Sequence, residues 1–245
     1  MATEVGYDIR AMSKPQKRNL WMMERAAYTA ERAAALAGVP KSTVHYWARE
    51  GVLVPSVSEE RVKLWSFADL MKLRLINWLR QDKERPDGKT ITGTSMGTIR
   101  RALVALADLD LELWTEDSGP SVQVDRGGRI VIQDPTPRGT EVGRWGELQI
   151  AQTDVLDLTK PFSMCAGHVG PDLHAPRQSL RIVPGKLAGA PHVINTRVET
   201  EALAALNLDG MQIEAIHSLY PALSVDAIAE ALDLEAQLQR NVAAA

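Results

Sequence analysis

Two short helices joined by only a few residues constrain the N-terminal part of the chain more than any other feature. In YTAERAAALAGVPKSTVHYWAREGVLVP, residues 28–55, the alanine-rich stretch Ala30–Ala37 stops at Gly38. Thr29 is typical of a helix N-cap and Gly38 of a helix end, and a second helix is expected over Pro40–Arg49. Because the connection is so short, the helices must turn sharply against each other, which predicts a helix-turn-helix.

The second helix is expected to carry polar and cationic side chains along its outer side. Lys41, His45 and Arg49 are spaced four residues apart, so on a helix they lie one above another. Val44 and Ala48 lie toward the other side, where they can pack on the first helix. Lys and Arg neutralise phosphates, while Ser, Thr and His can reach base edges in a major groove. The pattern favours a helix that reads double-stranded DNA over the alternative, a structural helix pair that binds no DNA.

A wing is predicted directly after the second helix. Apolar residues at positions 52 and 54, and again at 62 and 64, indicate two short strands around a polar turn at Ser56–Arg61. Cations in this wing can hold the DNA backbone. Ser66 is a candidate N-cap for a helix over Phe67–Arg80, and another helix is expected from about Met96 to Leu111. The predicted DNA contacts are Lys41, Ser42, Thr43, His45, Tyr46, Arg49, Arg61 and Lys63.

Charge divides the chain into two halves. Residues 1–110 carry 18 Lys and Arg against 13 acids, a net charge of +5, and residues 111–245 carry 10 against 18, a net charge of −8. The stretch Val198–Gln239 has eight acids and no Lys or Arg. A basic half joined to an acidic half indicates two different partners, although such a bias can also serve solubility alone.

The remaining composition is that of a globular cytosolic protein. Hydrophobic residues make up 45% of the chain and charged residues 24%. Cys165 is the one cysteine, so no intrachain disulfide can form. The opening residues lack the pattern of a signal peptide, and no apolar run reaches the roughly 20 residues that span a bilayer. We expect a cytoplasmic protein with no membrane partner.

The middle of the chain changes character. SVQVDRGGRIVIQD, residues 121–134, alternates Val and Ile around two glycines and predicts a β-hairpin. A lone hairpin is marginal in water, so it should pair with the strand near Leu148–Ile150 or with its copy in a homodimer. Residues 159–178 are interrupted by proline and contain few apolar residues, so they are expected to form a linker.

The last part predicts a small helical unit behind a compact loop with one or two strands. Its expected helices are about Glu199–Asn207, Met211–Leu219 and Val225–Arg240, with Ser224 as an N-cap. The fold class is therefore mainly α with small β. The expected divisions are a flexible arm over 1–27, a winged helix-turn-helix domain over 28–110, a hairpin and linker region with possible dimerisation over 111–178, and a C-terminal three-helix, helix-turn-helix-like domain over 179–245.

Two clusters could carry chemistry of another kind. Cys165, His168 and His174 fall in one loop, but zinc prefers four ligands and no fourth is evident locally. Asp154 and Asp157 could be paired carboxylates, yet acids three apart in a loop are more often solvated. The chain has no glycine-rich phosphate loop and no nucleophile beside a plausible His partner. We expect no enzyme, no metal and no cofactor.

Residues 28–55 are followed by RVKLWSFADLMKLRLINWLR, residues 61–80. Together with TSMGTIRRALVAL, these stretches resemble the DNA-binding domain of MerR-type regulators over roughly residues 28–110. Thr43–Trp47 stands where the family has Thr, a hydrophobic residue, Arg and two Tyr, with His45 in place of the Arg. Arg61 and Trp65–Leu70 match the family's wing Arg and the element after it. The resemblance implies a wing, two further helices and DNA binding as a dimer.

A second resemblance covers residues 181–232. RIVPGKLAGAPHVINTRVETEALAALNLDGMQIEAIHSLYPALSVDAIAEAL is similar to a small domain of antitoxins in bacterial type II toxin–antitoxin operons. The matching residues are Pro184, Gly185, Gly189, Pro191, Ile194, Thr196, Arg197, Gly210, Tyr220, Pro221 and Leu223. Asn195 replaces a family Gly, and Asn also tolerates positive φ. A MerR-like reader joined to this domain resembles VapB-type antitoxins, which implies a PIN-like ribonuclease toxin as partner and repression of the antitoxin's own operon.

These resemblances favour an antitoxin that neutralises its toxin and binds its own operator. The alternative is a MerR-type regulator whose C-terminal half senses a small effector, although a Cys or aromatic cluster is lacking there. A third reading, an RNA-binding or enzymatic module, is opposed by the acidic charge, which repels phosphates. In the antitoxin, Leu232 and Leu238 would anchor the last helix in a toxin groove and Arg240 would approach the toxin's acidic site. The other possibility is that the two leucines complete the domain core.

Overall fold

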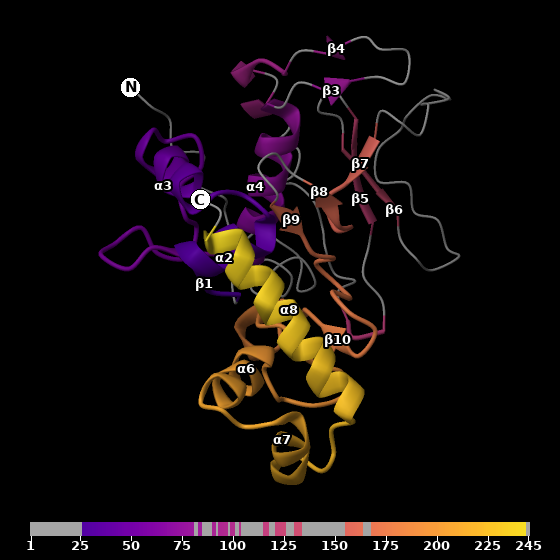
Figure 1. The fold of residues 1–245 in the computed structure, drawn as a ribbon. Helices are drawn as coiled ribbons and strands as arrows, with labels where there is room; N and C mark the ends of the chain where they lie inside the picture. Colours follow the sequence, from indigo (N-terminus) through magenta and orange to yellow (C-terminus); the bar gives the residue numbers. More distant parts are fainter. Residues whose placement is uncertain are drawn as a thin grey trace, which may run out of the picture.

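The computed structural model describes residues 26–243 except 81–82, 85–89, 92, 98, 101–102, 104–114, 118–120, 126–129, 134–154 and 164–167. The described part is mostly helical with small antiparallel sheets, as expected (Figure 1). Its helices are α2 (Ala30–Ala37), α3 (Lys41–Arg49), α4 (Phe67–Arg80), α6 (Thr200–Leu208), α7 (Ile213–Leu219) and α8 (Val225–Ala243). None of the described helices is long and apolar enough to cross a membrane.

The helix pair α2 and α3 forms as the sequence predicts. The Thr29 side chain accepts a hydrogen bond from the backbone N–H of Arg32 at 3.2 Å, which caps α2. Gly38 ends the helix in the left-handed conformation, with φ at +67°. From α3, Val44 and Trp47 are buried beneath the helix pair. The expected N-cap and helix end of α2 are confirmed.

The wing differs from its expected form. The expected strand at positions 62 and 64 is instead β2 (Leu64–Trp65), which pairs antiparallel with β1 (Tyr28–Thr29). The loop returns to it only through one bridge, between Ser58 and Leu64. Pro55 has no N–H for a ladder, and the Asp69 carboxylate holds the N–H of Ser56 at 2.9 Å. These two features end any strand after position 54, so the wing is a loop and not a two-stranded hairpin.

Helix α4 is tied to a distant segment through a buried arginine. Ser66 caps α4, since its hydroxyl accepts from the Asp69 N–H at 3.2 Å. Arg74 is fully buried. Its guanidinium donates to the carbonyls of Leu36 at 2.7 Å, Leu158 at 2.9 Å, Lys160 at 3.2 Å and Pro171 at 2.5 Å. Described residues between 157 and 173 are thus packed against the helix-turn-helix, where the sequence indicated a linker.

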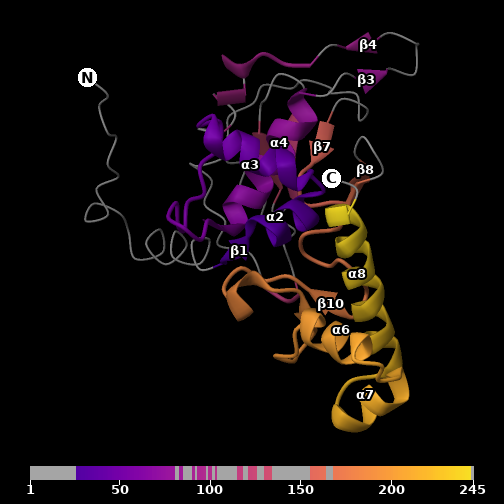
Figure 2. The same ribbon diagram turned by 60° about the vertical axis from the view of Figure 1, so that its left-hand side comes forward.

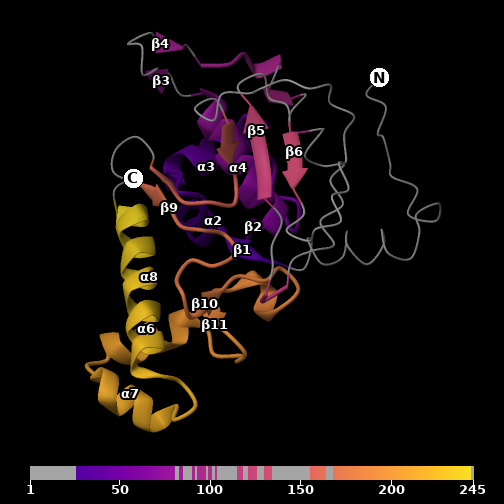
Figure 3. The same cartoon turned by 90° about the vertical axis from the view of Figure 1, so that its right-hand side faces the viewer.

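The expected hairpin is present. Strands β5 (Ser121–Asp125) and β6 (Ile130–Gln133) pair antiparallel, and Figure 3 shows them side by side. The third strand is β7 (Val155–Asp157), which pairs with β5 to give the order β6-β5-β7. The other expected partner strand, 148–150, lies outside the described residues. Two-stranded sheets are formed by β3 (Lys83–Glu84) with β4 (Thr90–Ile91) and by β8 (Phe162–Ser163) with β9 (Val169–Gly170).

The C-terminal part contains the expected three helices behind a pair of short strands. Strands β10 (Leu180–Arg181) and β11 (His192–Val193) are antiparallel, and the single turn η3 (Leu187–Gly189) lies between them. The Ser224 hydroxyl caps α8 by accepting from the Ala227 N–H at 3.1 Å. Asn195 has φ of +60°, as its replacement of a glycine predicted. Helix α8 runs to Ala243, three residues beyond the expected end.

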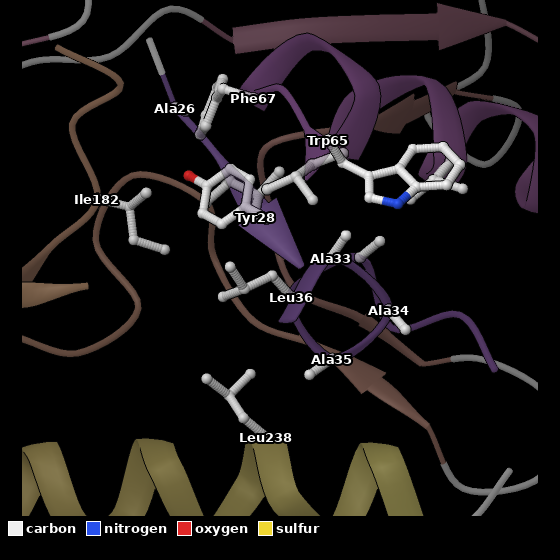
Figure 4. Close-up of a cluster of buried hydrophobic side chains, with 14 of the residues drawn as sticks. Ala26, Tyr28, Ala33, Ala34, Ala35, Leu36, Trp65, Phe67, Ile182 and Leu238 are labelled. Carbon is white, nitrogen blue, oxygen red and sulfur yellow. The ribbon is translucent and has the colours of Figure 1, made fainter. Parts of the chain in front are cut away.

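Helix α8 lies against α2. Figures 1 and 2 show α8 running from the α7 end of the molecule up to α2, with α7 at the far end. Leu238 points from α8 toward Ala35 and Leu36 of α2 in the core (Figure 4). Helices α2 and α8 therefore share one hydrophobic core.

Candidate nucleic-acid interface

The outer side of α3 presents the side chains that the sequence assigned to DNA. Ser42, His45, Tyr46 and Arg49 are exposed, and Lys41 and Thr43 are half-buried at its edge. The guanidinium of Arg49 lies over the ring of Tyr46, 5.6 Å from its centre. Burial of Val44, Trp47 and Ala48 on the opposite side fixes which face is outward. The helix therefore offers a cation, an imidazole, a phenol and a hydroxyl on one surface.

The acids that pair with the cations of this face lie at the surface. Lys41 pairs with Glu31 at 2.8 Å and Arg49 with Glu50 at 3.3 Å. Exposed pairs of this kind contribute about 0–1 kcal/mol, so phosphates can replace the carboxylates at little cost. In the loop after α3, Arg61 is exposed and Lys63 half-buried. All eight predicted contacts thus lie on α3 or on the loop that follows it.

Comparison with protein families matches residues 28–85 to the MerR HTH family regulatory protein. Residues 28–85 form a MerR-type helix-turn-helix domain. Residues 181–234 match a second family, described as protein of unknown function (DUF433). Comparison with the curated proteins and with the solved structures gives no match.

Helix α2 of the MerR-type domain is joined by a charged contact that the sequence did not predict to helix α8, which begins within the DUF433 match and runs past its last residue. Arg32 of α2 donates to both carboxylate oxygens of Glu235 in α8, at 2.6 and 2.7 Å. Thr200, at the start of α6, donates its hydroxyl to the same carboxylate. Glu235 is buried and Arg32 is largely so. Although burial alone would lower the pKa of Arg32, the hydrogen bonds and charge of Glu235 raise it, so the guanidinium stays charged.

A left-handed turn of the DUF433 domain packs on the first strand of the MerR-type domain. Leu187, Ala188 and Gly189 all have positive φ, at 52°, 49° and 78°. The Tyr28 hydroxyl donates to the Gly189 carbonyl at 2.8 Å, and the Ala27 N–H donates to the Ala188 carbonyl at 3.1 Å. Burial raises the pKa of Tyr28 above its usual value. A Cβ on Gly189 would lie 2.2 Å from the Tyr28 hydroxyl oxygen, so this contact requires glycine.

A third contact ties the middle of the chain to the DUF433 domain. The Glu116 carboxylate accepts hydrogen bonds from Lys186, from His192 at 2.9 Å and from the Asn195 N–H at 3.2 Å. Its backbone carbonyl accepts from Arg181 at 2.8 Å. Burial alone would raise the pKa of Glu116, but the hydrogen bonds from Lys186 and His192 outweigh it and hold the pKa below its usual value.

The three residues predicted to contact a toxin differ in how far they are buried. Leu238 is buried against α2, with 2% of its surface exposed, so it is a core residue and not a surface anchor. The hydrophobic effect gives the reason, because the MerR-type domain covers this end of α8. Leu232 is partly buried against the same core, and Arg240 is exposed.

The loop considered for a metal gives no cluster in the described part of the chain. His168 is buried, His174 bonds the Thr115 carbonyl at 2.8 Å, and Cys165 lies outside the described residues. Across the described residues, no three His, Cys, Asp or Glu side chains gather in an arrangement that could hold a metal ion. Of the paired acids, Asp157 caps the Thr159 N–H at 2.9 Å, and Asp154 is not described.

Proposed function

We infer from the MerR-type helix-turn-helix domain that the protein is a DNA-binding transcription regulator. We propose that the protein represses its own operon as a homodimer and neutralises a PIN-like ribonuclease encoded beside it, acting by binding and not by catalysis. The observation that carries the DNA part is the outward face of α3, with Ser42, His45, Tyr46 and Arg49 exposed together. The second helix of such a pair is the one that enters the major groove.

Dimerisation follows from the geometry of DNA sites. A two-fold protein reads two half-sites of a palindromic operator, and one MerR-type domain reads only one. The β6 strand lies at the edge of the β6-β5-β7 sheet, where its outer backbone groups can pair with another strand. This supports the sheet as the dimer contact.

The toxin part is supported by the charge of the DUF433 domain. Residues Val198–Gln239 contain eight acids and no Lys or Arg, and helices α6 and α7 carry many of their side chains on the surface. Such a surface repels nucleic acid and attracts a basic protein surface. An RNA-binding enzyme needs basic surface to hold its substrate, so a ribonuclease fits this requirement.

A second function is favoured by one observation. A cleft of about 790 Å³ lies between the two domains, within the size range of small-molecule sites. The protein could therefore be a MerR-type regulator that binds an effector there. Effector binding would change operator affinity without any ribonuclease.

Growth of bacteria that express the neighbouring ribonuclease tests the proposal. Cells that also express this protein should grow normally, and cells that express the ribonuclease alone should stop growing. In parallel, the full chain should shift a DNA fragment from its own promoter. Growth arrest in the presence of the full chain would refute the antitoxin function, and loss of the shift would refute the repressor function.

A further inference from the structure

The cleft between the two domains has one wall from each. Residues between 27 and 35, from β1 and α2, form the MerR-type wall, and Leu187, Ala188 and Ala190 also line the cleft. The other wall is formed by α6, within the DUF433 match, and by the part of α8 that continues past it. The Arg32–Glu235 pair lies among the lining residues, so the cleft sits directly on the contact that joins the domains.

The walls of the cleft are largely apolar. Ala35, Ala204, Ala205 and Val242 line it without charge. Leu208, at the end of α6, is also a lining residue and is 73% exposed. Covering this side chain with a partner would remove its apolar surface from water, which is favourable.

The charge of the cleft selects what can cover it. Four carboxylates line it, those of Glu31, Glu199, Glu201 and Glu235, against one described cation, Arg32. Arg32 is already engaged by Glu235, and Glu31 is paired with Lys41. Glu201 is exposed on the first turn of α6. An anionic ligand would be repelled, and a cation would be attracted into a partly desolvated site.

We propose that this cleft binds a cationic segment of the ribonuclease partner, with an apolar side chain of that segment covering Leu208 and a Lys or Arg beside it meeting Glu201. This rests on the proposed antitoxin function and names the surface that carries it. Because α2 forms one wall, the bound segment touches the MerR-type domain as well as the DUF433 domain.

A matched pair of double variants tests the site. Glu201→Lys with Leu208→Lys changes two exposed residues of the cleft, and Glu214→Lys with Leu219→Lys makes the same changes on α7, whose residues do not line the cleft. Leu219 is 57% exposed, so neither pair removes core packing. The measurement is calorimetric titration of the full chain with the purified ribonuclease in a catalytically inactive form. The cleft variant should bind roughly tenfold to hundredfold more weakly, and the α7 variant within about twofold of wild type.

The outcomes separate the two levels of the proposal. Equal affinities of both variants and wild type would overturn the cleft while leaving the antitoxin function intact. No binding of the wild-type chain would overturn both. A cleft variant that changes the chain's own association state in sedimentation, with ribonuclease affinity unchanged, would assign the cleft to a second copy and overturn the proposal.

Photocrosslinking tests the same site without changing any charged residue. Leu208→benzoylphenylalanine should crosslink to the ribonuclease, and Leu219→benzoylphenylalanine should not. Both positions are exposed, so the fold is retained in each. Equal crosslinking at the two positions, or crosslinking at position 219 alone, would contradict a partner seated in the cleft.

Discussion

The guanidinium of Arg32 and the carboxylate of Glu235, 203 positions apart in sequence, form a two-bonded ion pair with N···O distances of 2.6 and 2.7 Å. The pair fixes α2 of the MerR-type domain to α8, at a residue just past the end of the DUF433 match. Thr200 donates to the same carboxylate, so three elements meet at one buried acid. A change at the DUF433 domain can thus reach the DNA-binding helices through direct contact.

Arg32→Met should weaken the folded state. Removing one partner leaves a buried carboxylate short of its charged donor, which costs about 1.5–3 kcal/mol for a hydrogen bond to a charged group. Lys41→Met is the control, because it breaks an exposed pair in the same helix-turn-helix and should cost less than about 1 kcal/mol. Urea unfolding measures both free energies. Equal losses of unfolding free energy in the two variants would show that the buried pair stabilises the fold no more than the exposed pair does.

Gly38→Ala should destabilise the protein more than Gly51→Ala. Both glycines have left-handed φ, at +67° and +63°, so each alanine costs about 1–2 kcal/mol of backbone strain. A Cβ at position 38 would also lie 2.7 Å from the Gly170 backbone nitrogen, and a Cβ at 51 would meet nothing within 4 Å. Thermal melting should therefore show a lower Tm for Gly38→Ala. Matching Tm values would mean that the turn does not press on β9.

Arg74→Met should be among the most damaging single changes in α4. It leaves three buried carbonyl groups and one partly buried carbonyl group without their donor, and each buried acceptor left unpaired costs about 1–3 kcal/mol. Burial lowers the pKa of Arg74 to about 9, so the guanidinium is still charged at neutral pH. Arg80→Met, at an exposed position of the same helix, is the control. Chemical unfolding measures the free energy of unfolding of both variants. A loss for Arg74→Met as small as that for Arg80→Met would contradict the structural role of Arg74.

Glu116 should make stability depend on pH on the acid side. Its pKa in the folded protein is below the ordinary value of 4.5, so its ionised form is favoured by folding. That contribution is complete above about pH 4.5 and is lost as the pH falls through the lower, folded pKa. The Tm of wild type should exceed that of Glu116→Gln at pH 7, and the difference should shrink toward pH 3. A difference that grows on acidification would contradict this assignment.

Local signals in the sequence predicted the elements well, because caps and helix ends act over a few residues. Thr29, Gly38, Ser66 and Ser224 all sit where those signals place them. The prediction of a two-stranded wing was wrong. Its apolar residues fit a strand, but Pro55 and the hydrogen bond from Ser56 to Asp69 prevent one.

The contacts between distant segments could not be predicted from local sequence patterns. Arg74 looks like a surface residue of an amphipathic helix, and its four carbonyl partners come from segments 38 to 97 positions away. Leu238 fits a free apolar stripe equally well, and only the position of α2 makes it a core residue. Long-range packing decides such cases, and sequence spacing along one helix carries no information about it.

The central claim is that the outer face of α3 and the loop after it read DNA, and the salt dependence of operator affinity tests it most directly. Arg49→Gln with Arg61→Gln removes two exposed cations from this surface, and Arg197→Gln with Arg240→Gln removes two exposed cations from the C-terminal part. Loss of two phosphate contacts should reduce the slope of log affinity against log salt by roughly 1.8 in the first variant. The second should keep the wild-type slope. An unchanged slope and affinity for Arg49→Gln with Arg61→Gln would contradict the account.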